Sequence, residues 1–177
     1  MKTKFTVFSL FLLFLFVFSV AAFGQKYKEN IKESQKIIQE FKKKDPGISK
    51  FFNTAYGYVI FPHIGKGGLG VGGAGGKGTV FRRATPVSGA KMTQVTIGLQ
   101  AGGQKYAEVI FLENKEAYDR FMGSNFEFAA QVSAVALKEG VSKDADYRDG
   151  MLVFTMTIGG LMYEASIGGQ KFKVKPY

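Results

Sequence analysis

Nine glycines fall within the 14 residues from Gly65 to Gly78, in the stretch GKGGLGVGGAGGKG. Glycine lacks a Cβ atom, so a glycine-dense chain can approach other backbone closely, bulge or bend sharply. The residues that follow, TVFRR from Thr79, have the β-branched and aromatic character of a strand. We therefore expect this stretch to belong to a strongly curved β-sheet.

The same stretch matches the spacing G-x-G-x-x-G more than once. A dinucleotide-binding loop with that spacing opens a helix whose N-terminus holds the pyrophosphate, whereas a strand is expected here. The phosphate-loop pattern GxxxxGK[ST] also fails, because Val71 and Gly78 occupy positions that need Gly and Ser or Thr. The stretch predicts no nucleotide site, but Lys66 and Lys77 remain candidates for contacts with an anion.

The first 24 residues predict an export signal rather than part of the fold. Lys2 and Lys4 form a basic start, and the uncharged apolar run FTVFSLFLLFLFVFSVAAF follows from Phe5 to Phe23. Small residues at its end favour cleavage before Gln25. The alternative is an uncleaved anchor, because a helix of 19 residues nearly spans a bilayer core. We expect an exported, membrane-associated protein of the periplasm or cell envelope.

Composition excludes several kinds of site. The chain has no cysteine and one histidine, His63, so disulfides, thiolate and multi-histidine metal sites and cysteine nucleophiles are excluded. No GxSxG motif accompanies the histidine, and no pair of carboxylates marks a glycosidase. We therefore expect no catalytic residues, no metal and no cofactor, as in a binding protein.

The net charge is +10, and its distribution indicates an anionic partner. Without residues 1–24, the charge is +4 over residues 25–50, +1 over residues 51–170 and +3 over residues 171–177. Phospholipid is favoured over nucleic acid, because lysine outnumbers arginine, the residue preferred for bidentate recognition of bases and phosphates. Export argues against nucleic acid as well.

Residues from Tyr27 to about Lys43 predict an amphipathic helix. Apolar side chains share one face at spacings of four, seven and three: Tyr27, Ile31, Ile38 and Phe41. Lysines lie beside that face and at the end of the helix: Lys28, Lys32, Lys36, Lys42, Lys43 and Lys44. On an anionic membrane these lysines would contact headgroups, with Ile31, Ile38 and Phe41 inserting or packing. The alternative is a solvated lysine face on a helix that packs against the core.

The rest of the chain predicts one α+β domain. A short helix is expected over Ile48–Ala55 and another over residues 113–122, and the alanine-rich segment Phe126–Lys138 predicts a further helix that ends before Gly140. Strands are expected over Tyr56–Phe61, Val80–Arg82, Gln94–Gln100, Glu108–Leu112, Met151–Ile158, Tyr163–Ile167 and Phe172–Val174.

Three segments resemble the SYLF domain family: AYGYVIFPHIGKGGLGVGGAGGKGTVF, TQVTIGLQAGGQKYAEVIFLEN and, after a helical stretch, GGLMYEASIGGQKF. The resemblance runs from about Ile31 to Phe172. It implies phospholipid binding, with phosphoinositide headgroups in the wider family, partly through a basic amphipathic helix at residues 26–44, and it implies no catalysis. Some fungal members bind actin, but the chain looks like a bacterial, secreted member, which is not expected to meet actin or phosphoinositides.

These observations combine into one prediction. Residues 1–24 are a signal peptide, residues 25–50 a basic amphipathic helix, and residues 51–177 an α+β core with a curved, glycine-rich, mostly antiparallel, barrel-like sheet packed with helices. The predicted function is non-catalytic, peripheral binding of anionic phospholipid membranes. The alternative is a structural or protein-interaction module of the cell envelope that assembles through its sheet edges.

Overall fold

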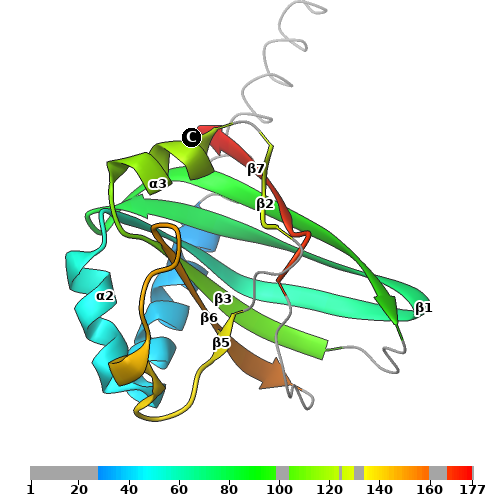
Figure 1. Cartoon of the computed structure of the whole chain (residues 1–177), viewed down its shortest axis with the longest axis horizontal. Helices are drawn as coiled ribbons and strands as arrows, with labels where there is room; N and C mark the ends of the chain where they lie inside the picture. The colour runs from blue at the N-terminus through cyan, green and yellow to red at the C-terminus, as the bar shows by residue number, and fades with distance from the viewer. Residues whose placement is uncertain (1–27, 99–103, 124, 130–133, 160–166, 177) are drawn as a thin grey trace, which may run out of the picture.

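The computed structural model describes residues 28–98, 104–123, 125–129, 134–159 and 167–176. Over these ranges the chain forms a seven-stranded sheet in the order β4-β7-β2-β1-β3-β6-β5, which curls into a half-barrel with helices packed against it (Figure 1). Neighbouring strands are antiparallel except β5 and β6, which are parallel. The predicted α+β class and curved, mostly antiparallel sheet are confirmed.

Strand β1 (Gly57–Arg82) lies at the centre of the sheet and contains the whole glycine-rich stretch. Its first part pairs with β3 (Gln104–Leu112) and its last part with β2 (Thr85–Gly98). Figure 1 shows β1 running out to one end of the molecule and returning. The sequence predicted two short strands here, 56–61 and 80–82. They are the two ends of one longer strand, because the glycines between them also adopt strand conformation.

Glycine allows the two halves of β1 to approach each other closely. A Cβ atom added to Gly78 would lie 2.5 Å from the carbonyl oxygen of Ile60, and one added to Gly76 would lie 2.8 Å from that of His63. Both contacts involve backbone atoms, which cannot rotate away as a flexible side chain can. The expectation that these glycines permit close approach and sheet curvature is confirmed.

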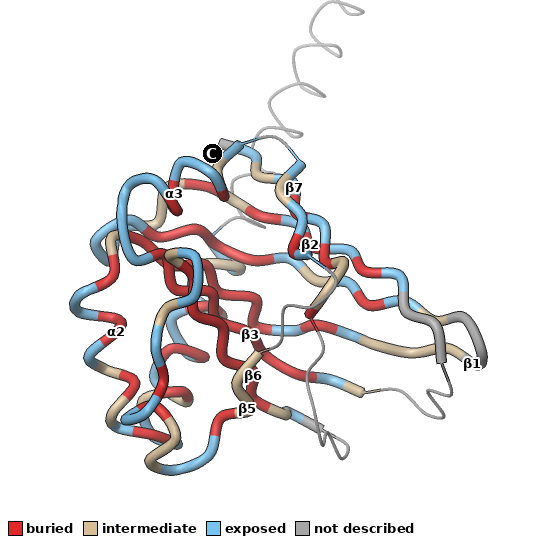
Figure 2. Tube along the Cα trace, viewed as in Figure 1, coloured by how far each residue is buried: buried red, intermediate tan, exposed pale blue. Residues whose placement is uncertain are grey.

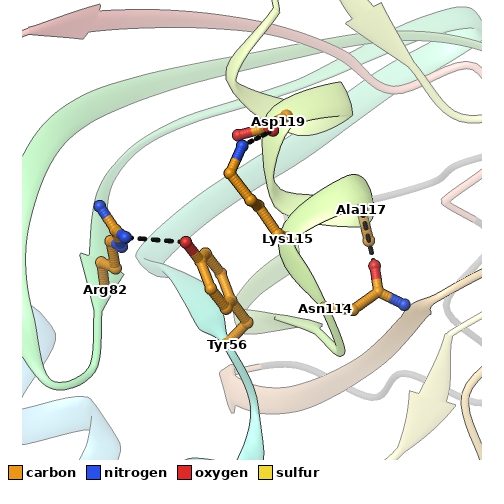
Figure 3. A network of polar contacts seen from close by, with 6 residues as sticks. All are labelled: Tyr56, Arg82, Asn114, Lys115, Ala117 and Asp119. Atoms are coloured by element: carbon orange, nitrogen blue, oxygen red, sulfur yellow. Dashed lines mark hydrogen bonds and ion pairs between the residues drawn. The ribbon is translucent and has the colours of Figure 1, made fainter.

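A polar contact joins the two ends of this long strand. Arg82, the last residue of β1, donates from Nη2 to the hydroxyl of Tyr56 across 2.8 Å, and its guanidinium lies 5.2 Å from the centre of that ring (Figure 3). Tyr56 immediately precedes β1. The two ends of β1 therefore lie together, as the return of the strand in Figure 1 requires.

The last strands complete the sheet on both sides. On one side β6 (Met151–Gly159) pairs with β3 and with β5 (Val135–Ala136); on the other, β7 (Lys171–Pro176) pairs with β2 and with β4 (Phe126–Glu127). The predicted helix over 126–138 is wrong, because its two ends form β4 and β5. Phe126 pairs with Phe172 and Val135 with Phe154. Packing of the partly buried Phe126 and Val135 side chains against the sheet therefore outweighs the helix propensity of alanine.

Helices cover the sheet at two places. The N-terminal helix (residues 28–44) is followed by the 3-10 turn η1 (Pro46–Ile48) and α2 (Ser49–Thr54), which confirms both predicted helices there. Helix α3 (Lys115–Met122) is capped at its N-terminus by Asn114, whose side chain accepts a hydrogen bond from the Ala117 amide at 2.9 Å (Figure 3). A second 3-10 turn, η2 (Val141–Asp144), lies against η1, and Asp45 joins them by accepting from the Ser142 amide at 2.8 Å.

The sheet buries apolar side chains on both faces. The buried residues are the red segments of Figure 2. One cluster lies between the outer face and the N-terminal helix with α2, and includes Phe41, Ile60 and Phe111. The other fills the inner, curled face under α3, and includes Phe61, Phe121 and Phe172. Successive residues of one strand therefore enter different clusters, as Ile60 and Phe61 do.

Some predictions fall outside the described residues. The export signal and nearly all of the expected strand 163–167 are among them. Within the described ranges, no helix combines the length and the apolar character that crossing a membrane requires.

Candidate functional site

The N-terminal helix is held against the outer face of the sheet. Asn30 donates from Nδ2 to the carbonyl oxygen of Gly78 at 3.2 Å. The Ser34 hydroxyl donates to the side-chain hydroxyl of Thr79 at 3.0 Å. One turn further on, Ile37 and Ile38 are buried, and Phe41 is fully buried. These contacts repeat at intervals of three and four residues, so one side of the helix belongs to the core.

The opposite side of this helix carries the predicted lysine row. Lys28, Lys32 and Lys36 are all exposed. Lys36 lies 3.9 Å from a carboxylate oxygen of Glu40, and both side chains are largely in solvent. Such a surface pair is weak, so Lys36 can still contact another anion. The predicted row is therefore present on the solvent side of a fixed helix.

The three lysines at the end of the helix differ from one another. Lys43 and Lys44 are exposed, but Lys42 is half-buried and its Nζ lies 5.2 Å from the centre of the Phe52 ring. This cation–π contact directs Lys42 towards α2. Two of the three are thus available on the surface beside the row.

The apolar side chains that were expected to insert or pack also differ in how far they are buried. Ile38 is 7% exposed and Phe41 is 0% exposed, both inside the outer-face cluster, and Ile31 is half-buried. Of the two roles considered for Ile38 and Phe41, packing is therefore what the structure shows. Neither side chain is on the surface of the folded protein.

The other basic candidates lie on the sheet. Lys77 and the lysines of β7 (Lys171, Lys173 and Lys175) are exposed. Lys66 lies in the half of β1 that pairs with β3, opposite Gln104, and is half-buried, whereas Lys77 lies in the half that pairs with β2. Lys171 lies 3.3 Å from a carboxylate oxygen of Glu127.

A buried polar cluster inside the half-barrel was not expected from the sequence. Glu108 of β3 is 0% exposed, and its Oε2 accepts from Gln170 Nε2 at 3.1 Å. The same Nε2 lies 3.5 Å from the Tyr106 hydroxyl. Glu108 Oε1, Gln170 Oε1 and the Thr155 hydroxyl have no hydrogen-bond partner among the described residues. The cluster thus places a carboxyl group where its charged form is poorly solvated.

The pKa values follow from this burial. Desolvation raises the pKa of Glu108 to about 7, although the hydrogen bond from Gln170 opposes the shift. Desolvation, and then the nearby Glu108 carboxylate, raise the pKa of Tyr106. A sequence signal existed, since Glu108 interrupts the otherwise apolar run YAEVIFL of β3. The described residues contain no group of three or more side chains suited to hold a metal ion.

Comparisons with known proteins give two matches. Residues 93–176 match the model of a family, Ysc84, described as Las17-binding protein actin regulator. The chain is also similar to Beta cell expansion factor A of Aeromonas veronii, at 30% identity over 136 residues, which is 72% of this chain and 49% of that protein. The chain therefore spans about half the length of this curated relative.

The segment that matches the family model is not a separate structural unit. It contains the end of β2 and strands β3 to β7, but β1 lies between β2 and β3 in the sheet. Residues before position 93 are therefore needed to complete the domain that the match identifies.

Proposed function

Because the chain belongs to the SYLF (Ysc84) family, we propose that it is an exported envelope protein that binds anionic phospholipid membranes peripherally and without catalysis. The wider family is known for lipid and actin binding. The contact surface is the solvent side of the N-terminal helix, with Lys28, Lys32 and Lys36 against phosphate headgroups and Lys43 and Lys44 beside them.

The observation that supports this proposal most is the docking of the helix. Ile37, Ile38 and Phe41 fix one side in the core, and the lysine row is therefore presented on the other side without further folding. A preformed surface loses less conformational entropy on binding than a helix that must first order. Each lysine near an anionic bilayer contributes about 1 kcal/mol, and salt weakens this contribution.

The alternative of assembly through sheet edges has less support. In the described sheet both edge strands, β4 and β5, are only two residues long. Very short edge strands are one of the ways in which proteins avoid pairing with another chain. Size-exclusion chromatography of the purified protein tests this alternative directly, since it requires oligomers that form without lipid.

The test is co-sedimentation with vesicles of phosphatidylcholine alone and of phosphatidylcholine with phosphatidylglycerol, at low and high salt. Protein purified from expression of the full chain is expected to bind the anionic vesicles at low salt. The combined variant Lys28→Glu, Lys32→Glu, Lys36→Glu is expected to lose this binding and to keep the wild-type melting temperature.

The matched control is Lys115→Glu, Lys138→Glu, Lys143→Glu. It makes the same change in net charge at exposed lysines that lie outside the N-terminal helix. Its binding should fall much less than that of the helix variant. Unchanged binding of the helix variant would contradict the proposed surface. Export is tested separately, by cell fractionation and by the N-terminal mass of the purified protein, for which cleavage before Gln25 is expected.

A further inference from the structure

The strand register aligns three lysines across three neighbouring strands. Lys77 of β1 lies directly opposite Lys91 of β2, and Lys91 lies directly opposite Lys173 of β7. We call Lys77, Lys91 and Lys173 the lysine ladder. Adjacent strands are about 4.8 Å apart, so the ladder extends over roughly 10 Å perpendicular to the strands.

The ladder lies on the outer face of the sheet. Ala90 and Met92, on either side of Lys91, belong to the inner cluster, and so does Phe172 beside Lys173. Because successive side chains of a strand point to opposite faces, the lysines point outwards. All three are exposed.

This arrangement of lysines destabilises the folded protein. Like charges directly opposite each other in an antiparallel sheet repel and destabilise it. Among the described residues, the ion pairs involve Lys36, Lys115, Arg120 and Lys171, and none involves the ladder. A row of three unneutralised charges is therefore a feature that an external anion, rather than the fold itself, would stabilise.

The surroundings of the ladder suit a flat partner. On the same outer face, the neighbouring positions Gly73 and Gly75 have no side chains, and Thr93 is small and exposed. Val95, two residues further along β2, is 76% exposed. An open surface with aligned lysines and a free apolar side chain has the chemistry of a bilayer interface, where headgroup phosphates lie above acyl chains.

The ladder begins beside the N-terminal helix. Asn30 contacts the carbonyl of Gly78, the residue that follows Lys77. We propose that the lysine ladder is a second contact surface for the anionic bilayer, on the same face of the sheet as the N-terminal helix. The inference rests on the proposed function for its ligand class but uses different residues and a different structural element.

The central position allows a test in which stability and binding change in opposite directions. Lys91→Glu places a carboxylate between Lys77 and Lys173, so two repulsive cross-strand pairs become attractive. The melting temperature is expected to rise. Binding to phosphatidylcholine vesicles containing phosphatidylglycerol is expected to fall about tenfold or more, because a favourable charge is removed and an unfavourable one is added.

Lys143→Glu is the matched control, since it makes the same change in charge at an exposed lysine of η2. It is expected to keep most of the binding. Equal binding by wild type and Lys91→Glu would overturn the ladder proposal, whatever the melting temperature does. An equal loss in Lys143→Glu and Lys91→Glu would also overturn it, because net charge alone would then explain the effect.

The outcomes separate this proposal from the proposed function. If the helix variant loses binding and Lys91→Glu keeps it, the helix surface stands and the ladder fails. If Lys91→Glu loses binding and the helix variant keeps it, the ladder stands and the helix surface fails. Wild-type protein that binds no anionic vesicle overturns both.

Discussion

The hydroxyl of Ser34 in the N-terminal helix donates a hydrogen bond to the hydroxyl of Thr79 in β1, with 3.0 Å between the two oxygens. Both side chains are 0% exposed, and 45 residues separate them in sequence. A buried hydroxyl that loses its partner keeps its desolvation cost. This pair therefore fixes the position of the helix along β1, and so the direction in which the lysine row faces.

Removing either hydroxyl should destabilise the protein. Ser34→Ala and Thr79→Val are each expected to lower the free energy of unfolding by about 1–2 kcal/mol, because each leaves one buried hydroxyl unpaired. The double variant should lose less than the sum of the two single losses. Urea denaturation of the four proteins measures this coupling.

Thr54→Ala is the control, since that hydroxyl is exposed and donates to the Lys50 carbonyl of its own helix. Its effect should stay within about 0.5 kcal/mol. Additive losses at Ser34 and Thr79 would show that the two hydroxyls do not interact in solution, and that the helix is not docked as described.

The glycines of β1 should differ sharply in their tolerance of a methyl group. Gly78→Ala is expected to destabilise the protein by about 3 kcal/mol, because the new Cβ would collide with the backbone of Ile60 and the ring of Phe61. Gly67→Ala should have almost no effect, since no atom beyond Gly67 and its two chain neighbours lies within 4 Å of an added Cβ. Thermal melts compare the two variants, and similar destabilisation by both would contradict the close approach within β1.

Stability should depend on pH through Glu108. Its pKa is about 7 in the folded protein against 4.5 for an ordinary glutamate, so between these values the folded state holds a proton that the unfolded state has lost. The contribution of this group to stability is therefore present below about pH 4.5 and is lost as the pH rises through 7. The total change is about 3 kcal/mol.

Glu108→Gln should remove this dependence and leave the protein more stable than wild type above pH 7. Urea denaturation at a series of pH values measures the difference. The control Glu139→Gln, at an exposed position, should follow the wild-type curve. A Glu108→Gln curve parallel to wild type would mean that the carboxyl group is hydrated in the folded protein.

The sequence was most informative where one residue type dictates backbone geometry. The glycines of β1 predicted close approach and curvature, and the apolar spacing of the N-terminal helix predicted its buried side, with Ile38 and Phe41 in the core. Both signals are local, since they depend on sterics or on helical period. A structure predicted from local sequence forms in the folded protein when the tertiary contacts favour the same structure.

Signals that depend on distant partners were missed. Residues 126–138 have local helix propensity, but Phe126 and Val135 pair with strands far along the chain. Lys91 gave no signal by itself, because the lysine ladder exists only through the register of β1, β2 and β7. Glu108 could be noticed as a charge within an apolar strand, but its contact with Gln170 joins residues 62 positions apart.

The placement of β7 has a consequence for the order of events during synthesis. This strand is the last part of the described chain, yet it pairs with β2 and brings Phe172 against the rings of Phe61 and Phe121 in the inner cluster. Until this strand has emerged from the ribosome, the edge of β2 and the aromatic rings beneath it stay uncovered. The domain therefore completes its core only after β7 has been synthesised, and a chain truncated before Lys171 would leave the inner face without its closing strand.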